Sequence, residues 1–184
     1  NPFVERNLIP LDTLQKAFLY SLKSNMNVQL VYPDYELPSE YKDLIYDIEH
    51  TNIVPSSLSS DADVVVLNSI DERIEGTPVN LIIRDTYRNI VSSYEKLASF
   101  LTTNAHVSIV IKDIEHIKEA DLSDYETLIN NIETIIADSV IKGKAIQISN
   151  ITDRLTLSKM NNCNAGWRSI TLAPNGRFYI CPSF

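Results

Sequence analysis

Cys163 and Cys181, the two cysteines of the chain, are the residues whose type and spacing point most directly to chemistry. They flank two short apolar runs separated by Asn175-Gly176. Asn-Gly between apolar segments is the strongest local signal for a β-hairpin, in a turn whose two central residues both take positive φ. We therefore expect one thiol before a hairpin and the other at its far end. Thiolates are soft ligands for metals and iron–sulfur clusters, and the alternative is a pair of free thiols.

Other candidate residues are less specific. Arg84-Asp85 and Arg88 follow a predicted strand, where they could grip a carboxylate or form a surface ion pair. Four tyrosines near the second predicted helix could form a peptide-binding wall or serve as ordinary core and surface residues; they are Tyr32, Tyr35, Tyr41 and Tyr46. The histidines are scattered and are expected to be surface or structural residues; they are His50, His106 and His116. The chain has no GxGxxG, P-loop, HExxH or GxSxG motif.

Composition narrows the classes of function. The chain has 184 residues, a formal net charge of -8 and 44% hydrophobic residues. An acidic chain lacks the basic stripe that nucleic-acid binding usually needs, so we expect no nucleic-acid partner. No apolar run is long enough to cross a bilayer, and two cysteines do not suggest a secreted disulfide scaffold, so a cytoplasmic location is expected. Because the chain opens at Asn1-Pro2 without a methionine, we expect further residues in front of it.

Helical and strand-like patterns alternate along the chain. Apolar residues at helical spacing predict helices over 12–24, 38–49, 87–101 and 122–141. Apolar runs predict strands over 28–32, 53–54, 64–67, 79–83, 106–111 and 145–148. Asp12, Ser39 and Ser123 are the expected helix caps, Ser123 with Glu126 at capping-box spacing.

This alternation predicts an α/β fold with a mostly parallel sheet, either open or an incomplete (βα) barrel, with four or five strands from these units. Ligands of such folds bind at the carboxyl ends of the strands. The segments that follow those ends are the places to look for a site. They are Tyr32 to Pro38, Asn68 to Asp71, Arg84-Asp85, Lys112 to Glu115 and Ser149 to Asp153.

The segment from Cys163 to Phe184 resembles the opening of the SPASM domain, an iron–sulfur module of radical-SAM peptide-modifying enzymes. Its spacing is Cys163, twelve residues, Gly176, four residues, Cys181. Together with Leu8–Leu14 and Val31–Pro38, it makes the chain similar to the CXXX-repeat peptide maturases. The resemblance implies a radical-SAM-like domain over 1–158, without its first strand and cluster loop, and a truncated SPASM-like module over 159–184.

The family implies maturation of a ribosomally made, cysteine-rich peptide. Cys163 and Cys181 would then be ligands of an auxiliary 4Fe–4S cluster, incomplete in this chain, which helps to hold or oxidise the substrate. Glu36 occupies the position of the family's GGEP segment, but Tyr32–Pro38 lacks the two glycines and no CxxxCxxC loop is present. Weak or absent S-adenosylmethionine binding is therefore expected. The alternative is a non-catalytic peptide-binding scaffold, so whether the chain is an enzyme stays open.

Overall fold

The computed structural model describes residues 8–60, 62–76, 80–149, 151–152 and 169–180. The chain divides into two compact units. The first contains Asn1–Gln29, Glu36–His50 and Lys159–Phe184, and the second contains Leu30–Tyr35 and Thr51–Ser158. The first unit holds the two N-terminal helices, and the second unit holds most of the sheet.

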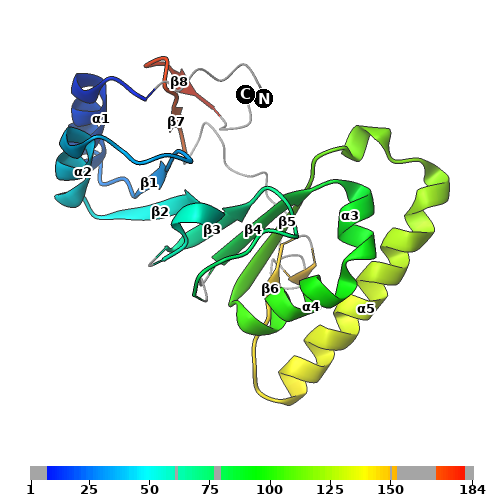
Figure 1. The fold of residues 1–184 in the computed structure, drawn as a ribbon. Coiled ribbons are helices and arrows are strands. Elements are labelled where there is room, and N and C mark those ends of the chain that lie inside the picture. The colour runs from blue at the N-terminus through cyan, green and yellow to red at the C-terminus, as the bar shows by residue number, and fades with distance from the viewer. Residues whose placement is uncertain (1–7, 61, 77–79, 150, 153–168, 181–184) are drawn as a thin grey trace. The chain divides into compact units, whose positions relative to one another are not determined.

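Six strands in the described part of the chain form one sheet, in the order of their sequence (Figure 1). They are β1 (Val28–Val31), β2 (His50–Pro55), β3 (Val64–Leu67), β4 (Asn80–Asp85), β5 (His106–Ile111) and β6 (Gln147–Ile148). Strands β2 to β6 pair in parallel, with Val65 opposite Leu81 and Leu81 opposite Val107. The expected α/β fold with a mostly parallel sheet is confirmed.

The helices lie close to their predicted ranges. They are α1 (Leu11–Lys23), α2 (Ser39–Tyr46), α3 (Tyr87–Ser92), α4 (Tyr94–Thr103) and α5 (Leu122–Ile141). Short 3₁₀ turns are η1 (Ser56–Leu58), η2 (Ile114–His116) and η3 (Glu119–Asp121). The single helix predicted over 87–101 is broken at Ser93, whose ψ of 38° departs from helical geometry.

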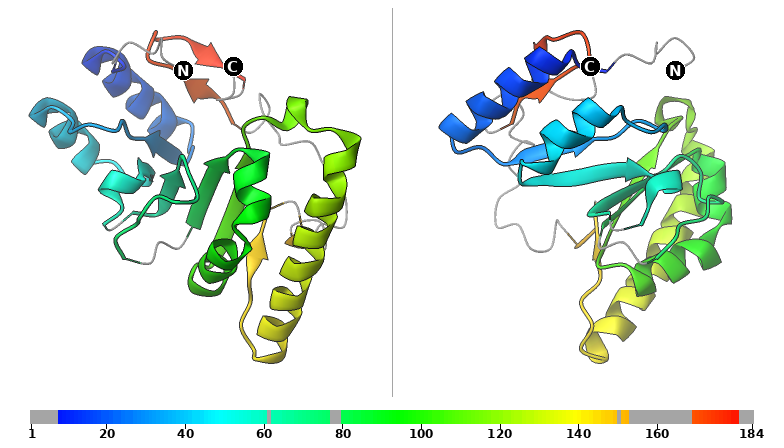
Figure 2. Two further views of the ribbon diagram at one scale, coloured as in Figure 1. Left: turned by 45° about the vertical axis from the view of Figure 1, so that its right-hand side comes forward. Right: turned by 60° about the vertical axis from the view of Figure 1, so that its left-hand side comes forward.

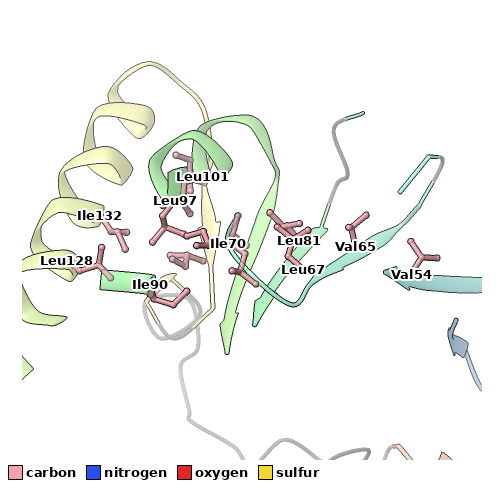
Figure 3. Packing of buried hydrophobic residues seen from close by; sticks show 14 residues of the cluster. Val54, Val65, Leu67, Ile70, Leu81, Ile90, Leu97, Leu101, Leu128 and Ile132 are labelled. Carbon is pink, nitrogen blue, oxygen red and sulfur yellow. The ribbon is translucent and has the colours of Figure 1, made fainter. Parts of the chain in front are cut away.

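The core of the second unit lies between one face of the sheet and three helices, α3, α4 and α5 (Figures 2 and 3). Alternate strand residues supply the sheet side, because neighbouring side chains of a strand point to opposite faces. Val65, Leu81 and Val107 are fully buried there. Leu97 of α4 and Ile132 of α5 are likewise fully buried against them. The strands follow the chain in order and pair in parallel, and the helices that connect β4, β5 and β6 therefore cover a single face of the sheet.

The predicted helix caps are wrong. Pro10, Pro38 and Asp121 occupy the N-cap positions of α1, α2 and α5, and none of them makes a side-chain capping bond. Asp12, Ser39 and Ser123 lie inside the first turns instead. The cap positions lie earlier than predicted. At α1 and α2 the carbonyl of a proline already accepts the first helical bonds, as Pro10 O does from Thr13 N and Leu14 N at 2.9 Å.

The predicted hairpin is confirmed, but its turn differs. Strands β7 (Thr171–Leu172) and β8 (Phe178–Tyr179) pair antiparallel. The turn runs from Ala173 to Gly176, with Gly176 N donating to Ala173 O at 2.9 Å. Gly176 has φ 75°, whereas Asn175 is not among the residues with positive φ. Pro174 is thus the second residue of an ordinary turn, followed by a left-handed glycine, as in three-residue hairpin loops.

Candidate functional site

Asp85, the last residue of β4, is the centre of a hydrogen-bonded cluster at the carboxyl edge of the sheet. Asp85 is only 2% exposed. The carboxylate accepts bonds from Thr86 N at 2.7 Å, Ile70 N at 2.8 Å, Asn89 Nδ2 at 2.9 Å and Ser69 Oγ at 3.1 Å. A buried carboxylate needs such donors, because an unpaired charge away from water is costly.

Two opposing effects set the pKa of Asp85. Burial has the largest single influence and raises the pKa. The bonds from Ile70, Thr86, Asn89 and Ser69 favour the ionised form, and together they hold the pKa below its usual range. Asp85 is therefore ionised, and it anchors the segment after β3 to the start of α3. Its carboxylate oxygens accept hydrogen bonds from the protein itself.

The ends of three neighbouring strands are joined around this anchor. Lys112, after β5, donates its Nζ to Asn68 O, after β3, at 2.7 Å. Its backbone N–H bonds Asp85 O at 2.8 Å. The next residue, Asp113, accepts from Tyr87 N at 2.7 Å, at the start of α3. The segments predicted to meet at the carboxyl edge, Asn68 to Asp71, Arg84-Asp85 and Lys112 to Glu115, are thus brought together.

The expected surface ion pair of Arg84, Asp85 and Arg88 does not form. Within the described residues the ion pairs join Lys16 to Asp12, Lys42 to Glu36, Lys96 to Asp71 and His116 to Glu115. Arg84 and Arg88 are both exposed. Asp85 instead points into the core side of the sheet, because it alternates with Leu81 and Ile83 along β4.

A pocket of about 550 Å³ lies beside this edge. Its walls come from α3, the start of α4, the segment after β5 and the N-terminal half of α5, all labelled or traceable in Figure 1. It is lined by Tyr87, Arg88, Val91, Ser92, Tyr94, Asp113, His116, Ile117, Asp121, Asp124, Thr127, Leu128 and Asn131. Its volume falls within the range typical of ligand sites.

Tyr87 fixes one wall of the pocket. Its hydroxyl donates to the backbone carbonyl of Asp121, and its ring lies 6.4 Å from that of Tyr125. The Asp121 carboxylate in turn accepts from Lys118 N at 3.1 Å, which holds η3 at the head of α5. Sequence reasoning found Arg88 and Asp113 but missed Asp121, Asp124 and Asn131. The sequence signal that could have revealed them is the group of acidic residues at the start of a helix, directly after a strand-end segment.

Glu36, predicted at the GGEP-like position, lies beyond the end of β1 on an exposed stretch. Its carboxylate is paired with Lys42 Nζ at 2.5 Å, and its side chain is 84% exposed. This lysine also holds the pKa of Glu36 below its ordinary value, through the hydrogen bond and through charge attraction. A carboxylate already bound to an ammonium group does not fit the role of a free acceptor for the ammonium group of S-adenosylmethionine.

Cys163 and Cys181 lie outside the described residues. Within the residues that are described, no group of three or more His, Cys, Asp and Glu side chains is placed to hold a metal ion. The 4Fe–4S cluster therefore has no ligand set in the described part, and the cysteine prediction stays a prediction. In the same residues, no helix has the length and apolar character that crossing a membrane requires.

The tyrosines predicted to form a peptide-binding wall have different environments. Tyr32 packs against the core of the second unit, and burial raises its pKa. Tyr41 donates to Ile9 O at 2.8 Å, whereas Tyr46 is 89% exposed. These environments match ordinary core and surface tyrosines.

The histidines have local partners, which fits the surface or structural roles expected for them. His50 Nδ1 lies 2.7 Å from Ile48 O. His106 Nε2 lies 3.2 Å from Ser149 Oγ, which is 2.7 Å from Ser108 Oγ. His116 is exposed beside Glu115 at the mouth of the pocket.

Comparison of the chain with family models, with curated proteins and with solved structures gave no match. The fold and its site therefore define the class only as an α/β domain with a parallel sheet and a pocket at its carboxyl edge.

Proposed function

We propose that this chain takes part in the maturation of a ribosomally made, cysteine-rich peptide, as a radical-SAM/SPASM-like protein. The observation that carries the proposal is the sheet, whose strands follow the chain in order and whose β2 to β6 are parallel. A partial (βα) barrel of that class needs this order. The hairpin turned at Gly176, between the two cysteines in sequence, supports the SPASM-like part. The proposal implies a cytoplasmic location, where thiol ligands stay reduced.

A second candidate is a peptide-binding scaffold of the same fold without catalytic activity. The ion pair between Glu36 and Lys42 favours it, because it occupies the carboxylate at the GGEP-like position. Anaerobic calorimetric titration with S-adenosylmethionine tests whether this chain holds a SAM site. Weak or no binding to this chain is the expected result. Micromolar binding would support the enzyme and would show that the Tyr32–Pro38 segment can serve a SAM site.

The partner is tested with a synthetic peptide that carries repeated cysteines, alongside a copy in which serine replaces every cysteine. We expect the chain to bind the cysteine peptide more tightly than the serine copy, measured by fluorescence anisotropy under reducing conditions. Equal affinity for the two peptides would remove the support for a cysteine-rich substrate and, with it, for either form of the proposal.

The two cysteines are tested by substitution. Iron–sulfur reconstitution is carried out anaerobically on the parent, on Cys163→Ala and on Cys181→Ala. A cluster needs about four protein ligands, so each substitution is expected to lower the bound iron. If both variants keep the parent's iron content, the cysteines are not ligands and the resemblance is limited to a hairpin.

A further inference from the structure

The pocket between α3 and α5 combines an apolar floor with a charged mouth. Leu128 is 3% exposed and Tyr87 is 9% exposed, and both line the pocket. Val91, Tyr94 and Ile117 are half-buried and complete the apolar part of the lining. Such a floor favours binding of a hydrocarbon chain, because the apolar surfaces of the ligand and of the pocket are then both removed from water.

The charged groups of the lining are predominantly acidic. Asp113, Asp121 and Asp124 contribute three carboxylates, and Arg88 contributes one guanidinium. With His116 neutral, the lining therefore carries a net charge of -2. Negative walls around a concave site concentrate field lines and attract cations.

The carboxylates differ in how far they are already engaged. Asp113 accepts from Tyr87 N, and Asp121 accepts from Lys118 N. Asp124 makes no side-chain hydrogen bond or ion pair with any other described residue, so its carboxylate is available to a ligand. Arg88 likewise has no such partner in the described part of the chain and can donate to a carbonyl group at the mouth.

The environment of Tyr87 supports this distribution of charge. Burial is the main cause that raises the pKa of its hydroxyl. The carboxylates of Asp124 and Asp121 raise the same pKa further, because a phenolate would lie close to two negative charges. The negative potential therefore extends from the mouth to the wall of the pocket.

We propose that this pocket binds a lysine or arginine side chain carried by a peptide. The aliphatic stem lies against Leu128 and its apolar neighbours, and the cationic head faces Asp124 and Asp121. Arg88 donates to a backbone carbonyl of the same peptide. This inference rests on the proposed function for the choice of a peptide as ligand, and it adds a basic residue as the feature that is recognised.

The test uses three capped pentapeptides that differ only in their central residue, which is lysine, arginine or norleucine. Norleucine keeps the aliphatic stem but lacks the charge. Binding to the full chain is followed by two-dimensional ¹H–¹⁵N NMR titration, which also reports weak binding. We expect the lysine and arginine peptides to bind at least tenfold more tightly than the norleucine peptide, with shift changes at Thr127, Leu128 and Asn131.

Two charge-removing substitutions on α5 complete the test. Asp124→Asn removes the unpaired carboxylate of the pocket, and we expect it to weaken the lysine peptide about 3- to 10-fold. Asp138→Asn removes the same charge from an exposed position of the same helix outside the pocket, and we expect no change. Circular dichroism confirms that both variants fold.

Equal binding of the norleucine peptide, shift changes away from the pocket, or an unchanged affinity in Asp124→Asn would overturn the inference. Free spermidine serves as a further arm, and binding as tight as that of the lysine peptide would show that no peptide is required. The repeated-cysteine peptide of the first test is synthesised without basic residues. Its binding therefore decides the proposed function independently of this pocket.

Discussion

At the scale of single residues, Asp85 shows how one side chain joins several segments. It accepts bonds from the residues that follow β3, from the start of α3 and from within α3. Two of these donors are backbone N–H groups, of which the buried one, Ile70 N, would otherwise be left without this partner. The carboxylate is therefore structural, and the chemistry available to ligands lies in the neighbouring pocket.

Asp85→Asn is expected to lower the free energy of unfolding by about 2–4 kcal/mol, because the amide nitrogen cannot accept hydrogen bonds from the surrounding donors. Urea unfolding followed by circular dichroism measures the change. Asp71→Asn is the matched control: Asp71 is exposed and paired with Lys96 on the surface. Its effect should stay within about 0.5 kcal/mol. Equal effects of the two substitutions would contradict the anchoring role of Asp85.

The pH dependence of stability follows from the lowered pKa of Asp85. A carboxylate whose pKa is lower in the folded chain stabilises the fold above its unfolded pKa, which is about 3.9. That contribution is lost as the pH falls through the lower, folded pKa. The stability difference between the parent and Asp85→Asn should therefore shrink between about pH 5 and pH 3, in urea unfolding at a series of pH values. A constant difference would show that the carboxylate's ionisation does not contribute.

At the scale of elements, the end of α5 illustrates what a glycine contributes. Gly143 has φ 75°, and Lys144 N donates to Ser139 O at 2.8 Å across it. This is the arrangement in which a left-handed residue ends a helix and satisfies its last carbonyls. An added Cβ at Gly143 would meet no atom within 4 Å, so any cost comes from the backbone conformation alone.

Gly143→Ala is therefore expected to lower the free energy of unfolding by about 1 kcal/mol, because alanine is strained at positive φ. Gly143→Asn should cost less, since asparagine tolerates the left-handed region better. Thermal and urea unfolding of both variants measure the difference. Alanine and asparagine variants of equal stability would indicate that Gly143 does not need positive φ in solution.

At the scale of the whole molecule, stability of the second unit depends on the face of the sheet that the helices cover. Ile132 of α5 is fully buried in this core, whereas Ile141 at the end of the same helix is 83% exposed. Both residues are isoleucines of one helix, so they form a matched pair that differs chiefly in burial.

Ile132→Ala should lower the free energy of unfolding by about 2–5 kcal/mol, because it removes buried apolar surface and leaves a cavity. Ile141→Ala should change it by less than about 0.5 kcal/mol. The comparison is made by chemical denaturation, with the slope of the transition checked for two-state behaviour. A small effect of Ile132→Ala would mean that α5 does not pack on the sheet as described.

The amino-acid sequence by itself determined most of the elements. Val64–Leu67, His106–Ile111 and Leu122–Ile141 were predicted at their observed bounds, because apolar period and length are local properties of the chain. The hairpin around Gly176 was also predicted, although its turn was not. The helix caps were misplaced by one to two residues, because a proline or a preceding 3₁₀ turn can begin a helix without a side-chain cap.

Only the tertiary structure decided how these elements make a site. Strand order placed Asn68, Asp85 and Lys112 together, and the packing of α3 against α5 brought Arg88 and Asp124 to one pocket. The strand-end segments could be predicted from the alternating pattern. Arg88 and Asp124 are tens of positions apart in the chain, so no local pattern could reveal that they line one pocket. Burial likewise distinguished Asp85 from an ordinary surface carboxylate, because exposure depends on what the rest of the chain packs around a residue.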